Sequence, residues 1–525
     1  MLCNGYVFLK CSCLSICRYY FNLSDRNRLL HLLLFVMTLF ITYSVITCSK
    51  SPAQNHLRVV IDLNIGESQK VKLINGDVVN IKLLDINEIL DDVRLAIRSS
   101  FVKVAVDEQE ITLNSANYNL PVTVANVQID CPITRGYYKN SNSDAWGLEK
   151  DARFRLWPAG SPFIVPGTFV YPVKQRWFAS DTQMSNEPCY VDWGENPSQK
   201  SIYYHNGLDF GGSEELVEIV SATDGLVVSA GKEGLPGYEN TPVSPRYDVI
   251  YILDEQGWYY RYSHLYSIDS SVRPGANVKM GQKIGMLGKE GGSGGWTHLH
   301  FDIHCRQPSG RWGTEEGYAY IWESYVNQYN PPLIAVARPH HLVFTGQTVT
   351  LNGRKSKSLV GEIITYEWTF SDGSTASGPT QQREYNLPGT YSEILKVVDS
   401  KGNIDYDFTV VQVRDKINPD QMPPSIHANY YPTFNIKPGD PVTFKVRTFR
   451  IEVGNEIWDF GDGTPPVTVK SFVERSAPIK GKYAETVHRF AKPGHYIVRV
   501  ERSNKYGYKA TAHLHVEVLN PDTRQ

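Results

Sequence analysis

The stretch WTHLHFDIH, Trp296–His304, alternates between polar and apolar residues. Its apolar residues occupy every second position: Leu299, Phe301 and Ile303. The positions between and beside them carry three imidazoles and one carboxylate: His298, His300, Asp302 and His304. Because side chains two apart on a β-strand point to the same face, this pattern predicts a strand with one face in a core and its imidazoles together on the other.

Two other segments carry polar groups that a metal ion could use. YYHNGLDFGG, Tyr203–Gly212, places His205 four residues before Asp209, and its glycines allow a tight bend that brings both side chains to one point. YRYSHLYSI, Tyr260–Ile268, carries His264. One imidazole and one carboxylate supply two zinc ligands, and a third ligand would leave the fourth position open for water, as in catalytic sites. The alternative is that these histidines only lie on a solvated sheet face or bond to backbone.

In this order, the three segments resemble the lysostaphin/LytM-type zinc endopeptidases: H-x(3)-D, then S-H-L, then H-x-H after a glycine-rich stretch. The resemblance covers residues 201–310. It implies one zinc ion bound by three residues: His205, Asp209 and His300. It also implies that His264 and His298 lie beside the open coordination position as catalytic residues, where either could accept the proton of the attacking water. The sequence leaves open which of the two is the base.

Other residues near the histidines have predicted roles around the same site. Asp302 is predicted to hold the imidazole of a metal ligand in one tautomer; an ordinary exposed strand carboxylate is the alternative. His304 is predicted to take no part. The stretch GKEGGSGG, Gly288–Gly295, lacks the G-K-[ST] ending and the following helix of a phosphate-binding loop, which argues against a nucleotide site and favours a flexible wall of a peptide groove.

The C-terminal part of the sequence contains an internal repeat. YEWTFSDGS, Tyr366–Ser374, matches EIWDFGDGT, Glu456–Thr464, and the strands of both copies are short and bounded by turns. This predicts two β-sandwiches, residues 332–416 and 417–520, with the tryptophans in their cores. The repeats resemble polycystic-kidney-disease (PKD) domains, although Ser371 replaces the first glycine of the motif in the first copy. The resemblance implies extracellular spacer or binding modules.

The region before residue 332 divides into three further parts. Residues 51–130 hold short β-type runs and are predicted to form a β-rich domain of unknown role. Residues 131–200 are loop-like and aromatic, and we expect them to pack as a lead-in against the next domain. Residues 201–331 are predicted to form an antiparallel β-sheet domain, with the stretch EEGYAYIWESYVNQY, Glu315–Tyr329, as a closing helix.

The N-terminus has the features of an export signal. Leu29–Thr47 contains no formally charged residue, and four basic residues precede it: Lys10, Arg18, Arg26 and Arg28. This order predicts a signal peptide or a membrane anchor within residues 1–50. Cys48 then follows in VITCSK, which resembles a bacterial lipobox and implies lipidation; the alternative is that it only ends an anchor helix. Everything after residue 50 is expected outside the cytoplasm, secreted or in a bacterial cell envelope.

The remaining cysteines fit that compartment. Cys131 and Cys189 are predicted to form a disulfide, because extracytoplasmic compartments are oxidising. Cys305 shares the alternation of Leu299 and is predicted to be a core residue.

The sequence as a whole predicts a mainly β, multidomain chain, and its formal net charge of -2 gives no support for nucleic-acid binding. The leading hypothesis is a zinc-dependent metalloendopeptidase outside the cytoplasm, associated with the membrane through its N-terminal segment or a lipid. The family resemblance implies the peptide cross-links of bacterial peptidoglycan as substrate. Two alternatives stay open: an endopeptidase that cuts extracellular proteins, and a non-catalytic envelope protein that binds or acts as a scaffold.

Overall fold

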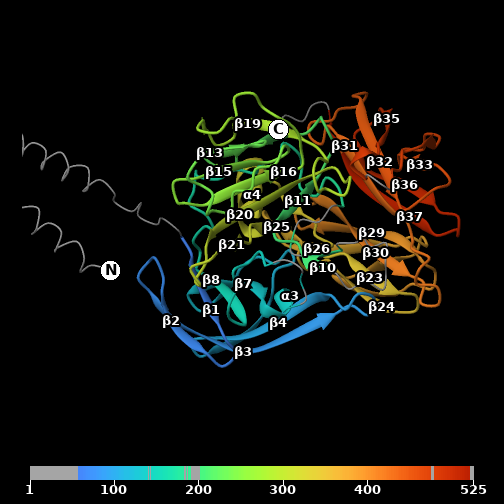
Figure 1. Cartoon of the computed structure of the whole chain (residues 1–525). Coiled ribbons are helices and arrows are strands. Elements are labelled where there is room, and N and C mark those ends of the chain that lie inside the picture. Colours follow the sequence, from blue (N-terminus) through green and yellow to red (C-terminus); the bar gives the residue numbers. More distant parts are fainter. Residues whose placement is uncertain are drawn as a thin grey trace, which may run out of the picture. The chain divides into compact units, whose positions relative to one another are not determined.

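The computed structural model describes residues 57–139, 141, 144–181, 185, 187–190, 202–474 and 478–520. Strands dominate these residues (Figure 1), which confirms the predicted mainly β, multidomain class. No helix in this part of the chain is long and apolar enough to cross a membrane. The predicted signal or anchor segment and Cys48 lie outside the described residues.

The N-terminal domain, residues 57–158, has two four-stranded antiparallel sheets, with the orders β1-β8-β7-β6 and β2-β3-β4-β5. Side chains of both sheets, among them Leu63, Ile81 and Phe154, form one buried cluster. The elements are β1 (Val59–Leu63), β2 (Ser68–Lys72), β3 (Val78–Leu90), β4 (Ile97–Val106), β5 (Gln109–Asn114), β6 (Val122–Val124), β7 (Val127–Thr134), α3 (Arg135–Lys139) and β8 (Ala152–Pro158).

Strand β8 belongs to this domain although the sequence places it in the expected lead-in. It pairs with β1 and β7. The stretch ARFRLWP is difficult to recognise as a buried strand because it contains two arginines. Their charges are neutralised by carboxylates inside the protein. Arg153 Nε lies 2.8 Å from Asp62 Oδ1, and Arg155 Nη2 lies 2.5 Å from Asp130 Oδ2. The N-terminal sheet therefore extends beyond the predicted boundary at residue 130.

The central domain, residues 202–330, is built on an eight-stranded sheet with the main order β11-β20-β16-β15-β13-β14, extended by β18 and β21. A three-stranded sheet, β12-β19-β17, and the pair β10-β9 complete the sheets of this region. The strands are β9 (Pro188–Tyr190), β10 (Ile202–Tyr204), β11 (Leu208–Gly211), β12 (Glu218–Val220), β13 (Gly225–Ala230), β14 (Glu233–Gly234), β15 (Ile250–Leu253), β16 (Tyr259–Ser263), β17 (Leu265–Ile268), β18 (Asn277–Val278), β19 (Lys283–Leu287), β20 (His298–Arg306) and β21 (Trp312–Glu315).

Strand β20 has the two faces that its alternation predicts. Leu299, Phe301 and Ile303 are at most 1% exposed and lie in the main core of the domain. Cys305 is 3% exposed in the same core, as predicted. The predicted closing helix is also confirmed, as α4 (Tyr318–Tyr329). Aromatic residues of the expected lead-in join this core: Phe169, Tyr171 and Trp177.

The predicted disulfide between Cys131 and Cys189 is not formed, and both residues are thiols. Cys131 is buried in the N-terminal core, with its Sγ 3.6 Å from the carbonyl oxygen of Ile133. Cys189 lies in β9, with its Sγ 3.8 Å from the carbonyl oxygen of Glu187. Because both cysteines are free, the structure contradicts the predicted disulfide.

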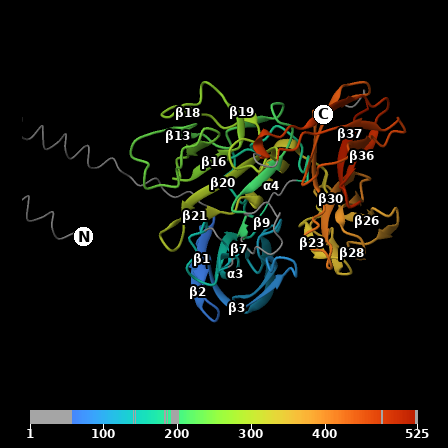
Figure 2. The ribbon, with the colours of Figure 1, turned by 45° about the vertical axis from the view of Figure 1, so that its right-hand side comes forward.

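The two C-terminal domains, residues 332–416 and 417–520, share a nine-stranded sheet, because β29 of the first pairs with β37 of the second. Figure 2 shows β30 of the first domain next to β36 and β37 of the second. Trp368 and Trp458 are fully buried, one in each core, as predicted. The elements are β22 (Leu333–Ile334), β23 (His341–Phe344), β24 (Thr348–Asn352), β25 (Lys357–Ser358), β26 (Ile363–Thr369), β27 (Thr375–Ser377), β28 (Thr380–Glu384), β29 (Gly389–Asp399), β30 (Ile404–Arg414), β31 (Ser425–Tyr431), β32 (Val442–Phe449), β33 (Glu456–Asp459), β34 (Val467–Val469), the 3₁₀ turn Pro478–Lys480, β35 (Ala484–His488), β36 (Gly494–Ser503) and β37 (Lys509–Val518).

Candidate metal centre

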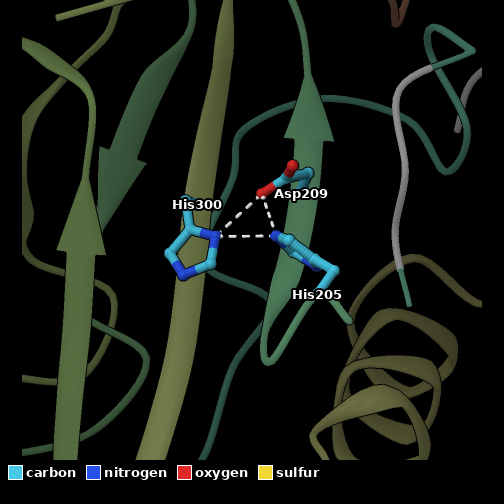
Figure 3. A group of neighbouring side chains, drawn as sticks. All are labelled: His205, Asp209 and His300. Carbon is cyan, nitrogen blue, oxygen red and sulfur yellow. Dashed lines mark hydrogen bonds and ion pairs between the residues drawn. The ribbon is translucent and has the colours of Figure 1, made fainter. Parts of the chain in front are cut away.

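The three residues that the sequence predicts as metal ligands meet at the edge of the central sheet. His205 follows β10, and Asp209 on β11 stands directly opposite His300 on β20. Figure 3 shows their polar atoms turned toward one another. His205 Nε2 lies 2.9 Å from His300 Nδ1, and both nitrogens lie 3.0 Å from Asp209 Oδ1. We call these three residues the His–Asp–His cluster.

The cluster has the size and the charge that suit a small divalent cation. Ligand atoms about 2.0 Å from a tetrahedral zinc ion are roughly 3.3 Å apart, close to the separations seen here. His300 Nε2 lies 2.9 Å from the carboxylate of Asp302, so Nε2 carries the ring proton and Nδ1 keeps a lone pair. In that tautomer the lone pairs of His300 Nδ1 and Asp209 Oδ1 face each other at 3.0 Å, an arrangement that a positive charge between them stabilises. A metal ion bound by all three residues would supply that charge.

Asp302 is the centre of a second set of contacts behind His300. It is 1% exposed, which excludes the alternative of an exposed strand carboxylate. Arg261 Nη1 lies 3.1 Å from its Oδ2, and His304 Nε2 lies 2.7 Å from its Oδ1. The sequence predicts no part for His304, and the structure places it against the same carboxylate that contacts His300.

The two predicted catalytic histidines lie beside the cluster, with their ring centroids 4.7 Å apart. His298 Nδ1 donates to the carbonyl oxygen of Trp296 at 3.0 Å, which leaves Nε2 as a proton acceptor 3.5 Å from Asp209 Oδ2. His264 Nδ1 donates to the carbonyl oxygen of Glu290 at 2.6 Å, so its Nε2 also keeps a lone pair. Burial lowers the pKa of His298 to about 3, and burial also lowers the pKa of His264 below its usual value.

The backbone of His264 is held by Asp248, a residue that the sequence does not indicate as part of the site. His264 has a φ of 68°, which is unusual for a residue other than glycine and needs a strong local constraint. Asp248 provides it, because its Oδ2 accepts a hydrogen bond from the backbone nitrogen of His264 at 3.0 Å. Asp248 is itself held by Arg246, whose Nη2 lies 2.7 Å from Oδ2. Sixteen residues and a turn separate Asp248 from His264, and no local motif joins them.

The His–Asp–His cluster and the two neighbouring histidines, His264 and His298, line a cavity of about 340 Å³. Part of its remaining wall comes from outside the central domain. The N-terminal domain supplies Arg98, the first C-terminal domain supplies His341 and Gln412, and the second supplies Ile426 and Arg450. A substrate that reached the cluster would therefore contact several domains at once.

Comparison with known proteins gives three family matches. Residues 203–310 match peptidase family M23, and residues 329–413 and 428–518 each match the PKD domain. A microbial collagenase from Vibrio alginolyticus is 28% identical over 91 residues, which are 16% of this chain and 11% of that protein. The chain thus spans about a tenth of the length of this curated relative.

Two solved structures share parts of the chain. The catalytic domain of the prophage-encoded M23 protein EnpA from Enterococcus faecalis is 19% identical, covers 29% of this chain and 93% of its own length, and has a TM-score of 0.17. A zinc containing peptidase from Vibrio cholerae is 15% identical, covers 44% of this chain and 84% of its own length, and has a TM-score of 0.20. From the family matches, the chain carries a peptidase family M23 domain followed by two PKD domains, a composition that supports a metallopeptidase.

Proposed function

We propose that the protein is a zinc-dependent endopeptidase that acts outside the cytoplasm. The observation that carries the proposal is the convergence of His205, Asp209 and His300 on one point, next to two imidazoles that keep proton-accepting nitrogens. Three protein ligands leave one position of a tetrahedral ion open, which is the arrangement of catalytic rather than structural zinc sites. The match of this region to peptidase family M23 supports the same reaction class.

The side chains divide the work of the reaction. His205, Asp209 and His300 would hold the zinc ion, which would supply Lewis acidity for a peptide carbonyl and for water. His298 and His264 are neutral at physiological pH, so either Nε2 can accept the proton of the attacking water and later return it to the leaving amine. A protonated imidazole at the same place would stabilise the oxyanion that develops on the carbonyl. Asp302 keeps His300 in the tautomer that presents Nδ1 to the ion.

The proposed substrate is the peptide cross-link of bacterial peptidoglycan, which the resemblance to lysostaphin/LytM-type enzymes implies. A second candidate is an extracellular protein, and the match to a microbial collagenase favours it. The PKD domains and the predicted export signal support an extracytoplasmic location in both cases. A non-catalytic scaffold is disfavoured by the complete set of ligand and proton-accepting groups.

The decisive experiment is a paired digest combined with a measurement of zinc content. The purified protein and its His298→Ala variant are incubated separately with peptidoglycan and with insoluble collagen, and released amines are quantified. We expect about one zinc per chain in both proteins and release of amines from peptidoglycan by the parent alone. Release from collagen only would move the substrate to the second candidate. A parent that binds zinc but cuts neither polymer would favour the scaffold, and a parent without zinc would refute the proposal.

A further inference from the structure

The second PKD domain is tied to the ends of the two strands that carry the metal cluster. Asn429 on β31 is fully buried, as are Ser213, just after β11, and Thr297, just before β20. The hydroxyl of Ser213 donates to Asn429 Oδ1 at 2.7 Å, and Asn429 Nδ2 donates to Thr297 Oγ1 at 3.1 Å. One amide therefore bridges the ends of β11 and β20. These strands contribute Asp209 and His300 to the cluster.

A second group of contacts holds the chain that leads into β20. Arg447 Nη1 donates to the carbonyl oxygen of Gly295 at 2.9 Å, and the Thr297 backbone nitrogen donates to the hydroxyl of Tyr483 at 3.1 Å. Trp296 stacks on Phe449 with ring centroids 4.5 Å apart and planes 4° from parallel. Residues 295, 296 and 297 are thus each held by the second PKD domain.

This segment sets the orientation of a catalytic histidine. His298 follows it directly, and the carbonyl oxygen of Trp296 accepts the hydrogen bond from His298 Nδ1. That bond fixes both the tautomer and the rotation of the imidazole. The segment belongs to a glycine-rich stretch, which has many accessible backbone conformations when nothing restrains it. Contacts from outside the central domain are therefore needed to select one of them.

The bridging contacts are chemically specific. A buried amide, hydroxyl or guanidinium that loses its partner costs more than it contributes when paired, so a polar interface of this kind is stable only in one geometry. Lys445 adds a further polar contact, with its Nζ 3.1 Å from the carbonyl oxygen of Glu214. An apolar interface would allow the two domains to slide, whereas this one fixes the β11 and β20 ends to within hydrogen-bond tolerance.

We propose that the second PKD domain is a positioning element of the active site, and that Asn429 holds the β11 and β20 ends so that the metal ligands and His298 stay in register. This inference rests on the proposed zinc peptidase function. It differs from the expected role of such domains as spacers or polymer binders, because the contacts to the β11 and β20 ends act on catalysis by positioning the metal ligands and His298. Displacements of about 1 Å at a site can cost 100-fold in rate, so weak tethering at this position would be sufficient to change turnover.

The test compares Asn429→Ala with Glu456→Gln in the full chain. Glu456 is fully buried in the same domain, and the residues that donate to it, Thr448, Ser471 and Arg502, all lie within that domain. The control therefore weakens the domain without removing a side chain that contacts the β11 or β20 end. Four quantities are measured: thermal stability, zinc affinity by competition with a chelator, kcat and KM, and hydrogen exchange of the backbone amides at the start of β20.

For Asn429→Ala we expect zinc affinity and kcat to fall about 10-fold each, KM to stay within twofold, and exchange at the start of β20 to accelerate. Glu456→Gln should lose thermal stability without these changes. Adding Ser213→Ala to Asn429→Ala should cost little more, because both act through one bridge. Parental zinc affinity, kcat and exchange in Asn429→Ala would overturn the inference, as would equal losses in Glu456→Gln. Absence of zinc from the parent would instead refute the proposed function, and the exchange data would still test the contact.

Discussion

Two buried polar clusters of the molecule neutralise their charges in opposite ways. The His–Asp–His cluster contains one carboxylate and two imidazoles, and its acceptor atoms face one another. The second cluster joins the N-terminal and central domains through two arginines and three carboxylates: Arg58, Arg155, Asp130, Glu315 and Glu316. In it each guanidinium lies against a carboxylate, for example Arg58 Nε 2.7 Å from Glu315 Oε1. We call it the arginine–carboxylate cluster.

Under the proposed function, this difference distinguishes a structural site from a metal-binding one. The arginine–carboxylate cluster carries its own cations, so it is complete within the chain, and its contribution is to fix two domains together. The His–Asp–His cluster has no arginine or lysine among its members, and in the proposed function a metal ion supplies its positive charge. Burial and perturbed pKa values occur in both clusters, so neither property alone identifies a functional site.

The largest effect is expected for His205→Ala in the His–Asp–His cluster. Removing one of three ligands should abolish zinc binding and lower activity about 10,000-fold, since the ion accounts for several kcal/mol of transition-state stabilisation. The metal-free variant should be less stable than the metal-free parent, because His205 is buried and its imidazole contacts Asp209, so zinc is compared per folded molecule. Zinc content and peptide release are the measurements. His488→Ala, which alters a histidine bonded to Asp462 in the second PKD domain, should keep its zinc. Zinc retained in His205→Ala would contradict the assignment.

The complementary change is Arg155→Met in the arginine–carboxylate cluster. It leaves Asp130 and Glu315 buried beside fewer cations and should reduce the free energy of unfolding by about 3–5 kcal/mol. Zinc content per folded molecule should not change. Chemical denaturation measures the loss. Lys103→Met is the control, because Lys103 and Glu110 form an exposed pair and should contribute less than about 1 kcal/mol. Equal losses in both variants would show that the cluster is not a special stabilising site.

His298→Ala and His264→Ala test whether these two histidines act as proton acceptors or as metal ligands. Each should keep one zinc ion while kcat falls about 100-fold, because each removes a proton acceptor and leaves the ligands in place. Single-turnover kinetics with equal zinc loading would measure the chemical step directly. If either variant lost its zinc, that histidine would belong with the ligands instead.

The smallest predicted effect is a pH dependence of stability from Glu316. Burial raises the pKa of Glu316 to about 7 in the folded protein. A carboxyl whose folded pKa lies above its unfolded value of about 4.5 stabilises the protein fully below that value and loses this contribution as pH rises through 7. We expect the free energy of unfolding to fall by about 2 kcal/mol between pH 5 and pH 7 from this group. Glu316→Gln should flatten the curve; an unchanged slope would show that another group titrates.

The sequence predicts those parts of the site that lie close together along the chain or follow a strand pattern. His205 and Asp209 are four residues apart, and the alternation in Trp296–His304 correctly divides β20 into a core face and a polar face. The resemblance of three short motifs joined His300 to the pair, and the structure brings the three together. Their roles in metal binding and catalysis stay predictions.

What the sequence could not predict depends on contacts between distant segments. Asp248 supports His264 across a turn, and Asn429 reaches Ser213 from 216 residues away. Strand β8 was not predicted because it contains Arg153 and Arg155. A charged residue in a buried strand can be expected only if its partner is known. The Cys131–Cys189 prediction failed for the same reason, since compartment chemistry says nothing about which sulfurs lie near each other.

The pairing of β11 with β20 has a consequence for the time at which the protein can become active. His300 is added to the growing chain 91 residues after Asp209, and Asn429 comes 216 residues after Ser213. A chain translated only as far as residue 299 holds His205 and Asp209 but not His300, so the proposed zinc site would be incomplete in it. Under the proposed function, the order of synthesis would delay hydrolytic competence until translation has passed residue 300.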